Sequence, residues 1–223
     1  MSRYLCLLAA TAAMMLAGRA DAAIRITEWM YSGDDGEFIE FTNTGATPVD
    51  LTGWSFSDSA RAPGAVSLSA LGTIAAGESF IVAEPTAAAF RTAWNLSGDV
   101  KVLGENTANL GRGDEMNIYD AANALVDRLT YGDQVIAGSI RAQNASGNPK
   151  TLGALGANDA LQWQLAAAGD AFGSYAGAAG NLGNPGSFAL VPEPATWGLS
   201  AIAIAAGVLA RAGALRRRLA AGS

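Results

Sequence analysis

Short segments in which apolar and polar residues alternate, separated by turns, fill most of the chain after residue 23. Alternation with a period of two is typical of β-strands that bury one face. The run Ser32-Gly33-Asp34-Asp35-Gly36 has the composition of a tight turn between two such segments. The pattern predicts strands at residues 24–27, 37–42, 49–56, 66–71, 79–84, 100–103, 115–120 and 124–131. Short strands about ten residues apart, without a long helical pattern, predict an all-β fold of the β-sandwich type.

Three further features refine this outline. Residues 86–94 favour one short helix, with Thr86 as its N-terminal cap. The last two predicted strands are expected to form a hairpin around Ala121-Ala122-Asn123. Of the twenty-one residues 166–186, thirteen are Ala or Gly, and this composition by itself predicts a loose linker.

The N-terminal end has the pattern of a secretory leader. Arg3 precedes an apolar run over residues 4–17, and Ala20-Asp21-Ala22 is a small-x-small cleavage motif. We therefore expect residues 1–22 to be a signal peptide, removed by signal peptidase after Ala22 or Ala23 once the secretion translocon has engaged the chain.

The C-terminal end combines three parts in a fixed order. The motif Val191-Pro192-Glu193-Pro194 cannot propagate a helix or a sheet ladder and is expected to stay extended. Sixteen residues without a charge follow, and as a helix they would measure roughly 24 Å. Extension to residue 215 past a snorkelling Arg211 would match a hydrocarbon core of about 30 Å. Arg216-Arg217-Arg218 would then hold the end in the cytoplasm.

This tail, residues 189–223, resembles the PEP-CTERM sorting signal of Gram-negative envelope and exopolysaccharide-associated proteins. The resemblance implies recognition by an exosortase, a membrane-embedded protease-transpeptidase, with Glu193 as part of the recognition site. It also implies export, a stage held in the inner membrane, and final placement in the envelope or the extracellular matrix. An ordinary C-terminal anchor that leaves the body permanently in the periplasm is the alternative.

Charge and composition exclude several function classes. Residues 24–190 contain eight basic and eighteen acidic residues, a net charge of −10 against −6 for the whole chain. A body this acidic repels phosphate backbones, so we expect no nucleic-acid binding. The chain has no histidine, and its one cysteine, Cys6, lies in the leader. Ser-His-Asp and Cys-His catalysis, zinc sites with His or Cys ligands and disulfides are therefore excluded from the body. We expect no cofactor and no enzyme activity.

The body also carries motifs of a known family. They are residues 26–31 (ITEWMY), 36–43 (GEFIEFTN), 49–56 (VDLTGWSF) and 113–120 (GDEMNIYD), followed by Leu125-Val126-Asp127 and Tyr131. Together they resemble the lamin tail domain, an immunoglobulin-like β-sandwich. Gln162-Trp163-Gln164 and Asn184-Pro185-Gly186 are similar to its closing part. The resemblance thus implies one domain over residues 24–188 and shortens the linker to a few residues before Val191.

Glu28 and Glu40 are unusual because Glu28 falls in phase with Ile24 and Ile26, and Glu40 falls in phase with Phe38. A carboxylate on an inward face must find a partner or become protonated. They are candidates for a general acid/base pair or a cation site. We favour structural carboxylates that accept hydrogen bonds from loop N–H groups, or that pair with Arg61 or Arg128.

Two further acidic motifs have alternative interpretations. Asp34, Asp35 and Glu37 could offer oxygen ligands to Ca²⁺, but their spacing fits no EF-hand loop, and solvated turn residues are favoured. Arg112-Gly113-Asp114 spells the tripeptide of some adhesion ligands but is expected to be an ordinary turn leading into a strand.

The last candidate functional residues are tryptophans and asparagines. The four tryptophans of the body favour core positions over a sugar-stacking platform, with Trp94 expected to be the most exposed; they are Trp29, Trp54, Trp94 and Trp163. Asn95 and Asn144 head formal glycosylation motifs that we expect to be unused. The sequence therefore predicts a structural or interaction role, with a carbohydrate- or cation-binding module as the alternative.

Overall fold

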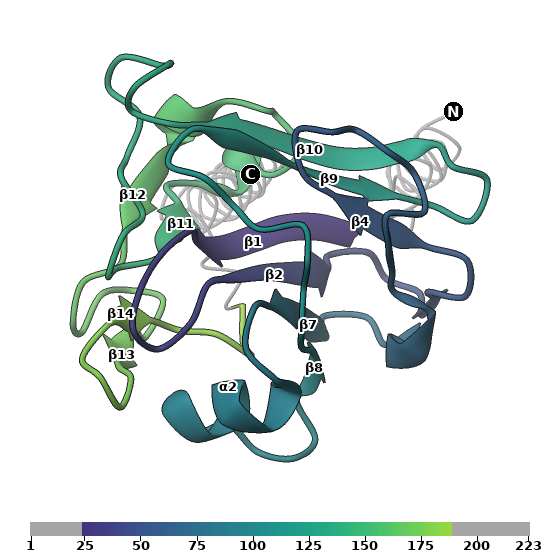
Figure 1. Ribbon diagram of the computed structural model, residues 1–223, viewed down its shortest axis with the longest axis horizontal. Coiled ribbons are helices and arrows are strands. Elements are labelled where there is room, and N and C mark those ends of the chain that lie inside the picture. Colours follow the sequence, from purple (N-terminus) through teal and green to yellow (C-terminus); the bar gives the residue numbers. More distant parts are fainter. Residues whose placement is uncertain (1–23, 189–223) are drawn as a thin grey trace, which may run out of the picture. The chain divides into compact units, whose positions relative to one another are not determined.

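The computed structural model describes residues 24–188 (Figure 1). The expected signal peptide with Ala20 and Ala22, and the tail of residues 189–223, lie outside the described residues. Between residues 24 and 188, none of the helices has the length and apolar character needed to cross a membrane.

Two sheets make up most of the fold, which is mostly β as expected. The six-stranded sheet has the order β12 (Trp163–Leu165), β11 (Gly147–Pro149), β1 (Ile24–Met30), β2 (Phe38–Asn43), β7 (Ser79–Ala83), β8 (Lys101–Leu103). The four-stranded sheet has the order β10 (Leu125–Tyr131), β9 (Asp114–Tyr119), β4 (Ser55–Ser57), β5 (Val66–Ser67). Neighbouring strands in both sheets are antiparallel except for β7 and β8.

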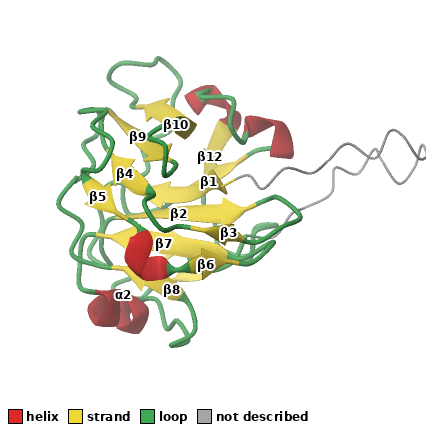
Figure 2. Cartoon of the chain, turned by 90° about the vertical axis from the view of Figure 1, so that its right-hand side faces the viewer, coloured by secondary structure: helices red, strands yellow, loops and turns green. Residues whose placement is uncertain are grey.

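The main core lies between these two sheets, and Figure 2 shows β9 and β10 facing β1 and β2. Alternate residues of facing strands meet there; they include Ile26, Trp29, Ile39, Phe41, Phe56, Met116, Ile118 and Leu129. Trp29 stacks on Tyr131 with ring centroids 4.0 Å apart. This packing is that of a β-sandwich, consistent with the immunoglobulin-like architecture.

A third layer covers the other face of the six-stranded sheet. It consists of the helix α2 (Ala87–Ala93) and the small hairpin of β13 (Tyr175–Ala176) and β14 (Leu182–Gly183), both below β1 and β2 in Figure 1. A second apolar cluster lies beneath α2; its buried members are Met30, Phe38, Ile81, Ala83, Phe90, Trp94 and Val102. Strands such as β2 are therefore buried on both faces.

Several predicted elements are confirmed. Strands β9 and β10 form the expected hairpin. The helix begins after Thr86, whose Oγ1 accepts a hydrogen bond from the amide of Ala89 at 3.2 Å, so the capping prediction is correct.

The single strand predicted over residues 49–56 is wrong. The segment divides into β3 (Val49–Asp50) and β4, which belong to different sheets, because β3 pairs with β6 (Thr73–Ile74) and β4 pairs with β9. Gly53 between them has a φ of 79°, a left-handed conformation that ends an extended strand.

Two other predictions need correction. Residues 66–71 form β5 and then a 3₁₀ helix, η1 (Ser69–Leu71), and not one strand. Short 3₁₀ helices η2 (Leu152–Ala154) and η3 (Ala160–Gln162) also follow β11. Residues 166–186 are not a loose linker, because they include β13 and β14 and contribute buried Ser174, Asn181 and Asn184.

Candidate functional site

A pair of buried carboxyl groups lies beneath the third layer. Glu28 on β1 and Glu40 on β2 are register partners, and both residues are 0% exposed. They occupy the face of the six-stranded sheet that carries Met30 and Phe38, away from the main core.

A β-bulge in β1 accounts for this placement. Ile26 pairs with Phe41 and Glu28 pairs with Glu40, so Thr27 is an extra residue opposite this step. After the bulge, Glu28 faces the third layer while Ile24, Ile26 and Trp29 point into the main core. The expected phase of Glu28 with Ile24 and Ile26 is therefore wrong.

Hydrogen bonds, two of them from loop amides as the favoured interpretation predicted, reach three of the four carboxylate oxygens of this pair. Oε1 of Glu28 accepts hydrogen bonds from the hydroxyl of Ser146 and from the amide of Asn184, the latter at 2.7 Å. Oε1 of Glu40 accepts from the hydroxyl of Thr27 at 2.8 Å, and its Oε2 accepts from the amide of Gly186 at 2.7 Å. The pair therefore holds the chain of residues 182–187, which we call the closing segment, against the sheet.

Burial makes both carboxyl groups unusually weak acids. Burial, and then the charge of Glu40, raise the pKa of Glu28 well above its usual range. Burial raises the pKa of Glu40 to about 7, although the hydrogen bonds of Thr27 and Gly186 favour its charged form. Because two neighbouring buried carboxylates repel each other, the pair holds a proton near neutral pH.

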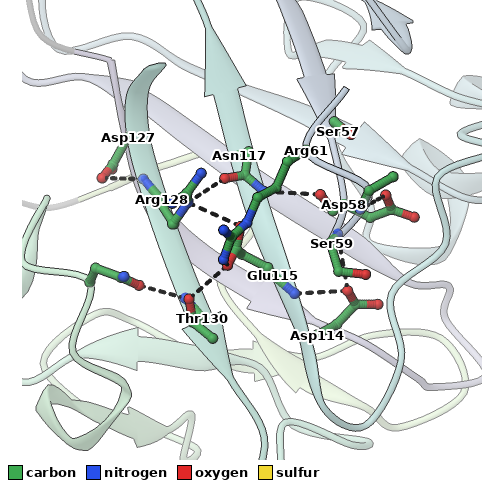
Figure 3. Close-up of polar contacts among 12 residues, drawn as sticks. Ser57, Asp58, Ser59, Arg61, Asp114, Glu115, Asn117, Asp127, Arg128 and Thr130 are labelled. Atoms are coloured by element: carbon green, nitrogen blue, oxygen red, sulfur yellow. Dashed lines mark hydrogen bonds and ion pairs between the residues drawn. The ribbon is translucent and has the colours of Figure 1, made fainter. Parts of the chain in front are cut away.

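The arginines expected to pair with Glu28 or Glu40 bind a different carboxylate. Arg61 donates two hydrogen bonds of 2.7 Å to Glu115 on β9, and Nε of Arg128 lies 3.0 Å from the same carboxylate. Figure 3 shows Thr130 and Asn117 completing this network, with Thr130 Oγ1 at 3.0 Å from Oε2 of Glu115. The expected pairing of Arg61 or Arg128 with Glu28 or Glu40 is wrong, because these arginines lie on the four-stranded sheet and its adjoining loop.

Glu115 is a charged structural group in this network. Its residue is 3% exposed, and burial alone would raise its pKa. Hydrogen bonds from Arg61, Asn117 and Thr130, with the charge of Arg128, outweigh burial and lower the pKa to about 2. In the sequence, Glu115 was noted only as part of the family motif of residues 113–120, and this motif did not reveal its partners.

The favoured interpretation of the acidic turn as solvated is wrong for Asp35 and Glu37, which are 3% and 6% exposed. Asp35 accepts hydrogen bonds from the amides of Ala179 and Asn181 at 2.7 and 3.0 Å, so it also holds the Gly-rich chain before β14. Glu37 accepts from the amide of Leu110 at 2.7 Å, and burial raises its pKa to about 8. Within residues 24–188, no group of three or more acidic side chains is placed to hold a metal ion.

The charged side chains of Arg112-Gly113-Asp114 form hydrogen bonds within the domain. Arg112 donates two hydrogen bonds to Asp133, at 2.8 and 2.6 Å. Asp114 accepts from the amides of Ser59, Gly111 and Glu115. Both charged groups are thus used to fix loops, as expected for an ordinary turn.

The tryptophans are core residues, but Trp94 is not the exposed one. It is 0% exposed, contacts Phe38, Phe90 and Tyr175, and donates from Nε1 to the carbonyl of Asp35 at 3.1 Å. Trp29 and Trp163 are also buried, while Trp54 is partly buried against the main core. The expected exposure of Trp94 fails because the hairpin of β13 and β14 covers the end of α2.

A small pocket adjoins the closing segment. It has a volume of about 280 Å³ and is lined by Gly77, Glu78, Ser79, Asp99, Val100, Gly186, Ser187 and Phe188. Ser79 links it to the carboxyl pair, because Ser79 Oγ lies 2.8 Å from Thr42 Oγ1, which lies 2.8 Å from Thr27 Oγ1. This pocket was not predicted from the sequence, because residues from three separate segments form it.

The comparison with protein families agrees with this architecture. The Lamin Tail Domain family matches residues 18–133, which include every strand from β1 to β10. The chain belongs to the lamin tail domain family. The lamin tail domain is an immunoglobulin-like and generally non-enzymatic domain. Searches of curated proteins and of solved structures gave no match.

The lamin tail match ends before the segments that cover the carboxyl pair. Strands β11 to β14, with Ser146, Asn148 and Asn184, follow residue 133. Asn184-Pro185-Gly186 was singled out in the sequence only by resemblance, and Ser146 was not predicted as a partner of Glu28. The sorting residues Val191, Pro192, Glu193 and Pro194, and Arg211, Arg216, Arg217 and Arg218, lie outside the described residues.

Proposed function

We propose that this lamin tail domain protein is exported and sorted to the cell envelope or extracellular matrix, where its body has a structural or interaction role. The observation that carries the proposal is the order of three sequence features after the body. Val191-Pro192-Glu193-Pro194 precedes a charge-free run, and Arg216-Arg217-Arg218 follows it. An exosortase-type membrane protease-transpeptidase is the partner that this order favours. The leader, with Ala20 and Ala22, would direct the body through the secretion translocon.

The body supports an interaction role better than catalysis. Glu28 and Glu40 are fully buried, so a substrate would have to displace the closing segment to reach them. Glu115, whose pKa is lowered to about 2, is held by two arginines, and Glu37, whose pKa is raised to about 8, is buried and accepts the amide hydrogen of Leu110. A general acid or base must be within hydrogen-bond reach of its substrate, and these groups are not.

A carbohydrate- or cation-binding module is the second candidate, and the pocket beside the closing segment is the observation that favours it. Phe188 offers a partly exposed aromatic side chain there, and Glu78 and Asp99 offer carboxylates. Aromatic faces and carboxylates are common contacts of sugars. The pocket is close in size to the smallest ordinary ligand sites, of roughly 300 Å³, so a single sugar unit is the largest ligand that it would enclose.

Cell fractionation tests the proposal. The full chain is expressed in a Gram-negative host with and without an exosortase, beside a Glu193→Ala variant, and is detected in the inner membrane and outside it. We expect the wild-type body to leave the inner membrane only when the exosortase is present, and the variant to leave it less. An equal distribution in all three cases would support a permanently anchored periplasmic protein and contradict sorting.

A further inference from the structure

A row of polar side chains crosses the buried face of the six-stranded sheet. Glu28 is opposite Glu40 on β2. On its other side Trp29 pairs with Gly147, so one step along the antiparallel ladder places Glu28 beside Asn148 of β11. Side chains at such positions have Cβ atoms about 5 Å apart and contact each other directly. Asn148, Glu28 and Glu40 are all 0% exposed.

Two neighbouring acceptors in this row lack a donor. Oε2 of Glu28 and Oδ1 of Asn148 are both buried without a hydrogen-bond partner in the described part of the chain. Nδ2 of Asn148 donates to Oδ1 of Asn184 at 3.0 Å, which leaves its own Oδ1 as the free atom. A buried acceptor without a donor destabilises the fold, and one hydrogen on Oε2 of Glu28 would satisfy both groups.

Glu40 is placed to exchange a proton with solvent. Its two oxygens already accept hydrogen bonds from Thr27 and Gly186. The hydroxyls of Thr27, Thr42 and Ser79 form a continuous chain that ends at the pocket. Hydroxyl groups both donate and accept, so such a chain can carry a proton between solvent and a buried carboxyl.

We propose that Glu28 and Glu40 form a proton-dependent latch for the closing segment. In this latch the protonated carboxyl group of Glu28 donates a hydrogen bond to Oδ1 of Asn148. With that proton in place, Glu28 accepts a hydrogen bond from the amide of Asn184, and Glu40 accepts one from the amide of Gly186. The closing segment then stays packed against the sheet. Loss of the proton leaves two adjacent buried carboxylates and an unpartnered oxygen beside Asn148. Residues 184–187 of the closing segment then open, because water can reach the charges only when these residues lift.

Acidic groups around the pair reinforce the opening that follows loss of the proton. Asp170, in the loop after β12, and Tyr175 on β13 face the pair, and each interacts electrostatically with Glu28. Glu78 and Asp99 line the pocket, and Glu78 is paired with Lys101 at 3.1 Å. Arg91 of α2 donates instead to the carbonyl of Val100. In the described part of the chain, the charge of Asp170 therefore adds to that of Glu40 in raising the pKa of Glu28.

The pair's own protonation is the first test, measured on the wild-type full chain in detergent micelles. The Cδ chemical shifts of ¹³C-labelled Glu28 and Glu40 report the proton directly. We expect Glu28 to titrate well above its ordinary range, in steps coupled to those of Glu40. Titration of Glu28 near its ordinary value of about 4.3 would overturn the proposal.

Amide hydrogen exchange tests the opening itself. The exchange rates of Asn184 and Gly186 are compared with that of Leu182, whose amide is bonded to the carbonyl of Asn144 and not to a carboxylate. From about pH 6 to about pH 9 we expect the ratio to rise about tenfold or more. A constant ratio would contradict a latch.

Two substitutions distinguish the latch from general alkaline unfolding. Glu28→Gln mimics the protonated acid, since its amide can donate to Asn148, and should leave the exchange ratio nearly independent of pH. Glu37→Gln removes another buried acid with a raised pKa, outside the pair, and should leave the rise in the ratio unchanged. If Glu37→Gln abolished the rise, or Glu28→Gln kept it, the pair would not be the latch.

Discussion

Glu28 and Glu40 face each other across β1 and β2 as fully buried register partners, and each accepts a backbone amide from the closing segment. The two carboxyl groups therefore connect strands inside the lamin tail match to the closing segment, which lies beyond residue 133. Two acids in one buried site make the stability of the domain depend on pH, and the direction follows from their pKa values.

The domain should lose stability as the pH rises from about 5 through neutrality. The folded-state pKa values of Glu28, Glu37 and Glu40 are raised, to about 8 for Glu37 and about 7 for Glu40. A group with a raised folded pKa stabilises the fold fully below its unfolded pKa and loses this contribution as the pH passes the folded value. We therefore expect Tm, measured by circular dichroism, to fall between about pH 5 and about pH 8. A Tm that rises through this range would contradict the assignment.

Acid should destabilise the fold through a different residue. Glu115 has a lowered pKa of about 2, so its contribution is present above its unfolded value and is lost as the pH falls toward 2. Glu115→Gln should cost about 1–3 kcal/mol at neutral pH, because Arg128 loses its buried charged partner. Arg112→Ala, which breaks an exposed pair, is the control and should change Tm little. Equal shifts in Tm for the two variants would show that the Glu115 network has no special role.

Trp94 should be required for folding and not for binding at a surface. It is the largest side chain beneath the third layer, so Trp94→Ala is expected to cost about 3–5 kcal/mol in urea denaturation. Leu165→Ala, on edge strand β12 and 43% exposed, is a control that should cost far less. A stable Trp94→Ala variant that had lost only glycan binding would restore the sugar-platform interpretation.

Gly183 should tolerate no side chain. A Cβ there would lie 2.9 Å from Oε1 of Glu28 and 3.1 Å from a ring carbon of Trp94. Both neighbours are fully buried and cannot yield, so Gly183→Ala is expected to destabilise by about 1–3 kcal/mol. Gly98→Ala meets no atom within 4 Å and is the matched control. Equal unfolding midpoints in urea for the two variants would contradict close packing of the closing segment.

Local patterns in the sequence predicted much of the sandwich. Alternation marked β1, β2, β7, β9 and β10, and Thr86 marked the start of α2. These features depend on neighbouring residues, whose periodicity and capping chemistry can be read directly.

The features that shape the candidate site depend on distant residues. A bulge at Thr27 shifts the phase of Glu28, and it shows only when β1 is aligned with β2. The Gly- and Ala-rich chain before β14 looks like a linker, yet Asp35 orders it from about 145 residues away through the amides of Ala179 and Asn181. Burial of Trp94 likewise requires β13, which the sequence did not predict.

The mass of the mature protein tests the proposed sorting most directly. The protein is recovered from the envelope and the medium of a host that carries an exosortase, and its intact mass is measured by mass spectrometry. We predict a chain that begins near Ala23 and ends near Pro194, so that the uncharged run and Arg216-Arg217-Arg218 are missing. A mature chain that still ends at Ser223 would contradict processing and identify the tail as a plain membrane anchor.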